Sequence, residues 1–178
     1  MPITTPAQQR LQQLVRVVPN YPKPGIDFRD ITPLLGSPAE FALAVVAMIT
    51  PWRDAGVTHV IGIESRGFIF GAPVALGLGA GFVPLRKPGK LPRTVLREAY
   101  ALEYGTDALE MHSDALQPGS RVLIVDDVLA TGGTAKAAAR LVHHAASELV
   151  GFGFFIEIEA LEARRQLPAV RVEATLVY

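Results

Sequence analysis

The 178-residue chain has no cysteine, which excludes disulfide scaffolds, thiolate zinc sites and cysteine nucleophiles. It has no excess charge of either sign, because 17 Lys and Arg balance 17 Asp and Glu. A protein that binds nucleic acid through its overall charge is therefore not expected. Hydrophobic residues make up 49% of the chain and charged residues 19%, which is typical of a globular domain and excludes a disordered chain.

Signals for export and membrane insertion are also missing. The first residues, MPITTPAQQRLQQ, have no basic segment followed by an apolar core, so they do not resemble a signal peptide. One uncharged run, residues 67–85, is long enough to span a bilayer, but its five glycines and two prolines favour a turn, a buried helix and a strand. We therefore expect a cytoplasmic protein with no membrane or nucleic-acid partner.

Helical and strand patterns alternate along the chain. Helices are predicted over 6–18, from 38 to about 52, over 68–77 and after the turn at 129–134. Strands are predicted over 57–63, 81–86, 121–127, 151–158 and 170–178, the last at an edge or half-buried. Residues 94–104 favour a strand or hairpin arm, and the proline-rich residues 18–35 an extended connector. This order predicts one α/β domain over 1–178, with a mostly parallel, twisted sheet flanked by helices.

The strongest motif is VLIVDDVLATGGTAKAA, residues 122–138. A buried strand ends in Asp126 and Asp127, and a glycine-rich turn then opens a helix. Ligands of open α/β sheets bind at the carboxyl ends of strands, and helix N-terminal amides bind anions. The two carboxylates would repel a phosphate, but they fit sugar hydroxyls or a cation beside it. The motif is neither a Walker A loop nor a dinucleotide-binding fingerprint.

The string VLIVDDVLATGGT resembles the phosphoribosyl-pyrophosphate (PRPP) binding motif of type I phosphoribosyltransferases. Three further segments, residues 21–35, 64–92 and 102–116, resemble the matching segments of adenine phosphoribosyltransferases. These segments follow the family's order and cover most of the chain between residues 21 and 138. The resemblance implies the type I phosphoribosyltransferase fold, with a small N-terminal hood over about 1–35 and a mobile lid hairpin over about 87–110.

The resemblance also implies an activity. Adenine phosphoribosyltransferases are purine salvage enzymes that join adenine to PRPP, giving AMP and pyrophosphate. They need Mg²⁺, which PRPP and water hold, so no direct protein ligand to the metal is expected. The family is usually homodimeric.

Site residues follow from the family's motifs. The pyrophosphate would be bound by five residues, namely Ser65, Arg66, Arg86, Lys87 and Lys90. The 5-phosphate would be bound by the turn residues Ala130, Thr131, Gly132, Gly133 and Thr134, while Asp126 and Asp127 face the ribose hydroxyls. The lid would supply Tyr104 and the general acid or base Glu103, and the Glu64–Arg66 turn would contain a non-proline cis peptide.

The adenine site would be formed by Asp27, Phe28, Arg29 and Ile158. Many members of the family have an apolar side chain where this chain has Asp27. The change is harmless if only the backbone of that residue binds the base, but an inward carboxylate would alter base preference.

Two other functions stay open at this point. A xanthine-type purine phosphoribosyltransferase shares the PRPP motif. A PRPP-sensing regulator would need a nucleic-acid module, for which about twenty residues before residue 21 and a net charge of zero give little support. The four histidines show no metal-ligand spacing.

Overall fold

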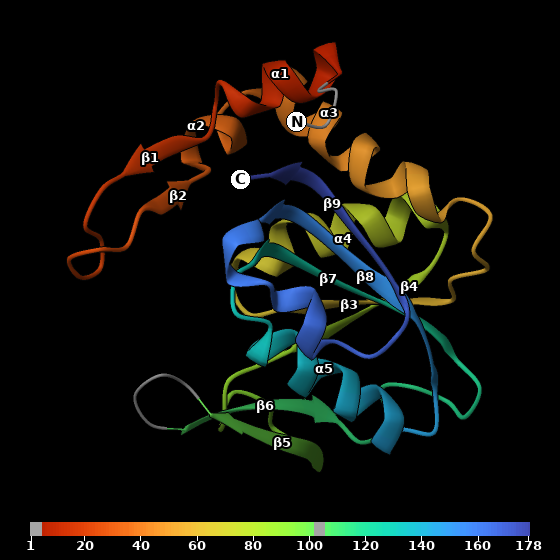
Figure 1. Ribbon diagram of the computed structural model, residues 1–178. Helices are drawn as coiled ribbons and strands as arrows, with labels where there is room; N and C mark the ends of the chain where they lie inside the picture. The colour runs from red at the N-terminus through yellow and green to blue at the C-terminus, as the bar shows by residue number, and fades with distance from the viewer. Residues whose placement is uncertain (1–4, 102–105) are drawn as a thin grey trace. The chain divides into compact units, whose positions relative to one another are not determined.

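The computed structural model describes residues 5–101 and 106–178 (Figure 1). The chain divides into two compact units, one up to Ala47 and the other from Met48 onward. The first unit contains α1 (Pro6–Gln12), β1 (Arg16–Val18), β2 (Phe28–Asp30), α2 (Thr32–Leu35) and most of α3 (Pro38–Ile49). Thr5 caps α1 in a reciprocal capping box with Gln8, as the sequence pattern predicts.

The first predicted helix is too long. The sequence pattern predicts a helix over residues 6–18, but α1 ends at Gln12 and β1 pairs antiparallel with β2, with Val17 opposite Arg29. The β-branched Val17 and Val18 favour this strand once a partner is available. The prediction of a wholly extended connector over 18–35 is wrong as well, since it contains β2 and the short helix α2.

The second unit is built on five parallel strands in the order β4-β3-β7-β8-β9. Their bounds are His59–Ile63 for β3, Gly81–Leu85 for β4, Arg121–Leu129 for β7, Glu148–Glu157 for β8 and Arg171–Val177 for β9. The helices α4 (Arg66–Leu78) and α5 (Gly133–His144) lie on opposite faces of this sheet (Figure 1). The α/β prediction is therefore confirmed, and β9 lies at an edge as expected.

A second, antiparallel sheet consists of β5 (Val95–Ala101) and β6 (Thr106–His112), which form a hairpin beside α5 (Figure 1). Arg140 of α5 donates to Glu98 of β5 at 2.7 Å. Three short 3-10 helices complete the unit, at Thr50–Trp52, Glu159–Leu161 and Ala163–Gln166.

The predicted ends of several elements shift by a few residues. The helix expected over 68–77 begins at Arg66, and the strand expected over 121–127 continues to Leu129. The strand expected over 151–158 begins at Glu148, because it pairs with β7 from Arg121 onward. The uncharged run 67–85 folds as most of α4 followed by β4, and no helix of the described residues is long and apolar enough to cross a membrane.

The strand β8 passes closely over the indole of Trp52 at Gly151. A Cβ atom at this position would lie 2.5 Å from Trp52 and 2.6 Å from the carbonyl oxygen of Arg171. We expect Gly151→Ala to lower the free energy of unfolding by about 1–3 kcal/mol, because neither the buried ring nor the backbone can move away without cost. Chemical denaturation measures this change.

The matched control is Gly153→Ala, two residues further along the same strand. Its Cβ atom would lie 3.4 Å from the Trp52 ring nitrogen, which is an ordinary contact distance. An equal loss of stability in the two variants would contradict the packing account.

Candidate active site

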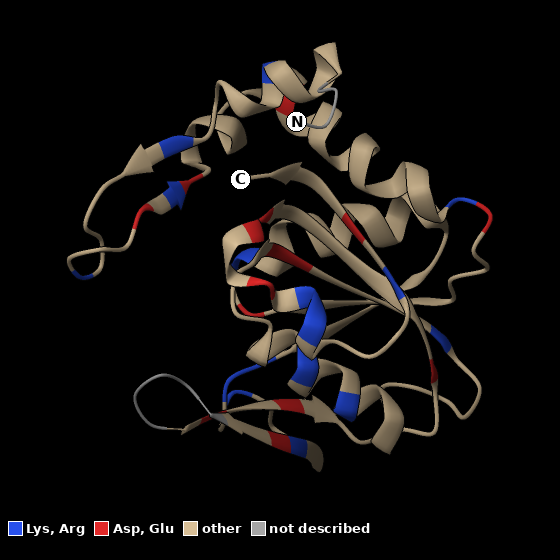
Figure 2. Ribbon diagram, in the orientation of Figure 1, with Lys and Arg blue, Asp and Glu red and all other residues tan. Residues whose placement is uncertain are grey.

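The order of the strands defines where a ligand would bind. In the strand order, β3 and β7 are neighbours. The connection after β3 leads outward to β4 at one edge of the sheet, and the connection after β7 leads in the opposite direction, to β8. Such a reversal between the neighbours β3 and β7 opens a crevice at their carboxyl ends, where open α/β sheets bind ligands. Figure 2 shows acidic residues near the end of β7 and basic residues on the segment after β4.

We call the turn after β7, at residues 130–134, the cradle. Gly132 adopts a φ of +85°, and a Cβ atom there would lie 3.1 Å from the carbonyl oxygen of Ala163. Glycine is therefore required by both conformation and space. Helix α5 begins directly afterwards at Gly133, and its first amides have no acceptor within the helix. With Thr131 and Thr134 alongside, this turn can hold an anionic group.

The segment that packs against the cradle is fixed by an ion pair. Ala163, which contacts Gly132, is buried, and the next residue, Arg164, binds Glu157 through two hydrogen bonds of 2.7 and 2.6 Å. Arg164 also donates to the carbonyl oxygen of Val172 in β9 at 2.9 Å. The cradle therefore rests on a segment that is tied to β8 and β9.

Two adjacent carboxylates stand beside the cradle. Asp127 is 5% exposed. Its Oδ2 lies 2.8 Å from Nε of Arg66 and forms an ion pair with it, although the two groups are not aligned for a hydrogen bond. Asp126 accepts a hydrogen bond from the backbone N–H of Asp127 at 2.9 Å. Burial raises the pKa of both carboxyls; the charge of Asp127 adds to the rise at Asp126, while Arg66 opposes it at Asp127.

The predicted pyrophosphate residues come from two neighbouring strand ends. Ser65 and Arg66 follow β3, and the Glu64–Ser65 peptide is cis, as the resemblance implies. Arg86 and Lys87 follow β4. Glu64 joins the two segments, because its Oε2 accepts from Nε of Arg86 at 2.9 Å and from the backbone N–H of Lys87 at 2.8 Å.

This junction is charged and partly buried. The hydrogen bond from Arg86 holds the pKa of Glu64 below its usual value, against the effect of burial. The guanidinium of Arg86 also lies 5.9 Å from the ring centre of Phe68. Lys90 is exposed, and its backbone N–H donates to the carbonyl oxygen of Lys87 at 3.3 Å. Glu64 is not among the site residues that the sequence predicts, although it lies in the same turn as Ser65 and Arg66.

The remaining predicted residues are divided between the first unit, the second unit and a segment that the structure does not describe. Glu103 and Tyr104 lie outside the described residues. Asp27 is exposed and Phe28 stacks edge-on against Tyr21 at 5.3 Å in the first unit, which also contains Arg29. Ile158, in the second unit, donates its N–H to the carbonyl oxygen of Leu129 at 3.0 Å. The adenine pocket stays a prediction.

No group of three or more His, Asp or Glu that could hold a metal ion occurs among residues 5–101 and 106–178.

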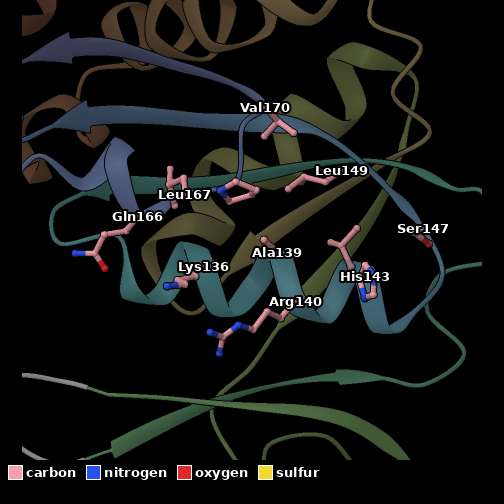
Figure 3. Close-up of a pocket in the computed structure, with 11 residues that line it drawn as sticks. Lys136, Ala139, Arg140, His143, Ser147, Leu149, Gln166, Leu167 and Val170 are labelled. Atoms are coloured by element: carbon pink, nitrogen blue, oxygen red, sulfur yellow. The ribbon is translucent and has the colours of Figure 1, made fainter.

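A separate groove of about 480 Å³ lies along α5 (Figure 3). Apolar side chains from β8 and the segment before β9 line it, together with the polar side of the helix: Leu149, Leu167, Val170, Lys136, Arg140 and His143. It contains none of the predicted site residues.

The chain matches the model of the phosphoribosyl transferase domain over residues 45–175. It is 52% identical to the adenine phosphoribosyltransferase of Erwinia tasmaniensis over 97% of this chain and 95% of that protein. The crystal structure of adenine phosphoribosyltransferase from Rhodothermus marinus is 54% identical and superposes with a TM-score of 0.92, covering 97% of this chain and 98% of that one.

The corresponding structure from Saccharomyces cerevisiae, in complex with D-2,5-dideoxy-2,5-imino-altritol 1,6-bisphosphate and adenine, is 38% identical. Its TM-score is 0.91, with 96% of this chain and 99% of that chain covered. The chain therefore belongs to the phosphoribosyl transferase domain family. Within that family it groups with the adenine phosphoribosyltransferases.

The raised pKa of Asp126 gives a prediction about stability. The pKa of this carboxyl is higher in the folded state than the unfolded value of 3.8, so below pH 3.8 it does not lower the free energy of unfolding. As the pH rises from 3.8 through the folded pKa, the carboxyl increasingly destabilises the fold. We expect Asp126→Asn to raise Tm at pH 7–8 by about 2–4 °C, which corresponds to roughly 1 kcal/mol in a chain of this length. Tm measured against pH for both proteins checks this.

If Asp126 faces the ribose hydroxyls as the sequence predicts, the same variant should bind PRPP more weakly at pH 7–8, since Asn keeps the acceptor for the Asp127 N–H but loses the negative charge. Stability and binding then change in opposite directions. A Tm difference that is the same at pH 4 and pH 8, or a parallel loss of Tm and PRPP binding, would contradict this reading.

Proposed function

We propose that this protein transfers the 5-phosphoribosyl group of PRPP to adenine, giving AMP and pyrophosphate in purine salvage. The observation that carries the proposal is the cradle at Gly132 and Gly133, together with the carboxylates of Asp126 and Asp127 near the end of β7. A terminal phosphate and a sugar diol are separated by a few ångström in PRPP, and this site offers amides for the first and acids for the second. The family membership supports the same activity.

In the proposed mechanism the chain first holds PRPP by both ends. Residues 130–134 bind the 5-phosphate through backbone amides and Thr hydroxyls, and Asp126 and Asp127 accept hydrogen bonds from the ribose hydroxyls. Ser65, Arg66, Arg86, Lys87 and Lys90 bind the pyrophosphate. These groups fix C1 of the ribose in line with the incoming base, which lowers the entropic cost of the reaction.

The chemical step breaks the bond between C1 and the pyrophosphate oxygen while N9 of adenine bonds to C1. Negative charge grows on the leaving pyrophosphate, where the basic side chains stabilise it. Adenine loses one ring proton, and we assign its transfer to Glu103. Phe28, Arg29, Ile158 and the backbone of Asp27 would hold the base, and Tyr104 would help exclude water, which could otherwise hydrolyse PRPP.

The proposal includes Mg²⁺ bound to PRPP. The pairing of Asp127 with Arg66 fits this arrangement, because that carboxylate already has a cationic partner in the protein. When bound, the cation would neutralise part of the pyrophosphate charge. The homodimer and the cytoplasmic location remain predictions from the sequence.

The direct test is a spectrophotometric assay with magnesium PRPP and each of adenine, hypoxanthine, guanine and xanthine. We expect turnover of adenine, with the other three bases used far less well. Turnover of xanthine and not adenine would replace the proposal by the xanthine-type enzyme. Absence of turnover with every base, together with nucleic-acid binding, would favour a PRPP-sensing regulator.

The role of Glu103 is tested by Glu103→Leu. Loss of a group that transfers a proton typically costs a factor of roughly 10²–10⁴ in rate, so kcat should fall by about that amount. The affinity for PRPP, measured by calorimetry, should change little, because this residue does not contact PRPP in the proposed mechanism. An unaltered kcat would remove Glu103 from the reaction.

A further inference from the structure

The side chain of Lys87 is held by two residues of the β5–β6 hairpin. Its Nζ donates a hydrogen bond to the hydroxyl oxygen of Tyr100 at 2.9 Å and forms an ion pair with Oδ2 of Asp107. The Tyr100 hydroxyl in turn donates to the same Oδ2 at 3.1 Å. The three groups therefore form a closed ring of hydrogen bonds.

The hairpin fixes this arrangement. Tyr100 and Asp107 are directly opposite each other in the antiparallel pairing of β5 and β6. Tyr100 is buried, and the second carboxylate oxygen of Asp107 accepts from the backbone N–H of Ala108 at 2.8 Å. The ring of Tyr100 also lies beneath the ammonium, at 5.5 Å from its centre. The position of Lys87 Nζ is thus set by strand register rather than by its own flexible side chain.

The ammonium keeps one donor for a ligand. A lysine has three N–H donors, and among the described residues two of them are used by Tyr100 and Asp107. The side chain of Lys87 is 38% exposed, so the third donor can reach solvent. A lysine fixed in this way loses less rotamer freedom on binding a phosphate than a free one does.

The charges of the pair support the same arrangement. Burial lowers the pKa of Lys87, but the hydrogen bonds to Asp107 and Tyr100 outweigh it, and the net pKa is raised. The hydrogen bond from Lys87 lowers the pKa of Asp107 in return. Lys87 therefore stays a full cation and Asp107 a full anion at neutral pH.

We propose that Asp107 and Tyr100 are positioning residues that hold the Lys87 ammonium in place for the pyrophosphate group of PRPP. The inference rests on the proposed function, because it takes Lys87 as a pyrophosphate ligand. Neither residue contacts the substrate. Asp107 also brings a negative charge close to the anionic pyrophosphate. The gain in affinity from holding Lys87 in place must therefore be larger than the loss from the repulsion between Asp107 and pyrophosphate.

The test measures the dissociation constant of magnesium pyrophosphate by calorimetry for the full-length protein and four variants. These are Lys87→Met, Asp107→Asn, Tyr100→Phe and the double variant Lys87→Met with Asp107→Asn. We expect Lys87→Met to weaken binding by about 10–100-fold, the range of a charge-assisted hydrogen bond. Asp107→Asn and Tyr100→Phe should weaken it by about 3–10-fold.

The double variant separates positioning from a general structural effect. If Asp107 acts through Lys87, then Asp107→Asn has no further effect once Lys87 is Met, and the two changes are not additive. The KM for adenine should change less than twofold in Asp107→Asn, since the base does not contact Lys87. The matched control is Asp114→Asn, an exposed carboxylate paired with Arg93 at 2.5 Å, which should bind pyrophosphate like the unchanged protein.

The outcomes distinguish the inference from the function on which it rests. If Lys87→Met weakens pyrophosphate binding while Asp107→Asn leaves it unchanged or tightens it, the positioning role is wrong and the transferase stands. Additive losses in the double variant overturn the inference as well. If Lys87→Met binds magnesium pyrophosphate normally, Lys87 is not a pyrophosphate ligand and the inference is wrong. The proposed transferase activity is wrong only if adenine and PRPP give no AMP.

Discussion

The close approach of Gly67 to Asp126 is the constraint on which the site depends. A Cβ atom on Gly67 would lie 2.7 Å from Oδ1 of Asp126 and 3.0 Å from the carbonyl oxygen of Val125. Only glycine allows the start of α4 to pack this closely on β7. That packing places Arg66 within 2.8 Å of Asp127, so the residues after β3 and the residues at the end of β7 form one site.

Three of the proposed pyrophosphate cations are each paired with a carboxylate of the protein: Arg66 with Asp127, Arg86 with Glu64 and Lys87 with Asp107. These pairs hold flexible, charged side chains at defined positions. The energetic value lies in preorganisation, because a cation that is already oriented does not have to be reorganised as negative charge develops on a leaving group. The anions that hold the cations come from the turn after β3, from β6 and from β7, so the sheet and the hairpin together position these cations.

Much of the second unit could be predicted from the sequence, because its signals are local. The buried run 121–127 and the glycine turn after it predict β7, the cradle and α5 within two residues. The pairing of β1 with β2 could not be predicted, since residues 16–18 become a strand only when residues 28–30 lie beside them. The contact between Lys87 and Asp107 depends on the hairpin register in the same way. Local patterns carry no information on such partners.

The most direct test of the account is a crystal structure of this protein with AMP bound. The account predicts that the 5′-phosphate accepts hydrogen bonds from the backbone amides around Gly132 and Gly133, and that the ribose hydroxyls donate to Asp126 and Asp127. AMP bound at another place, with no phosphate at residues 130–134, would contradict it.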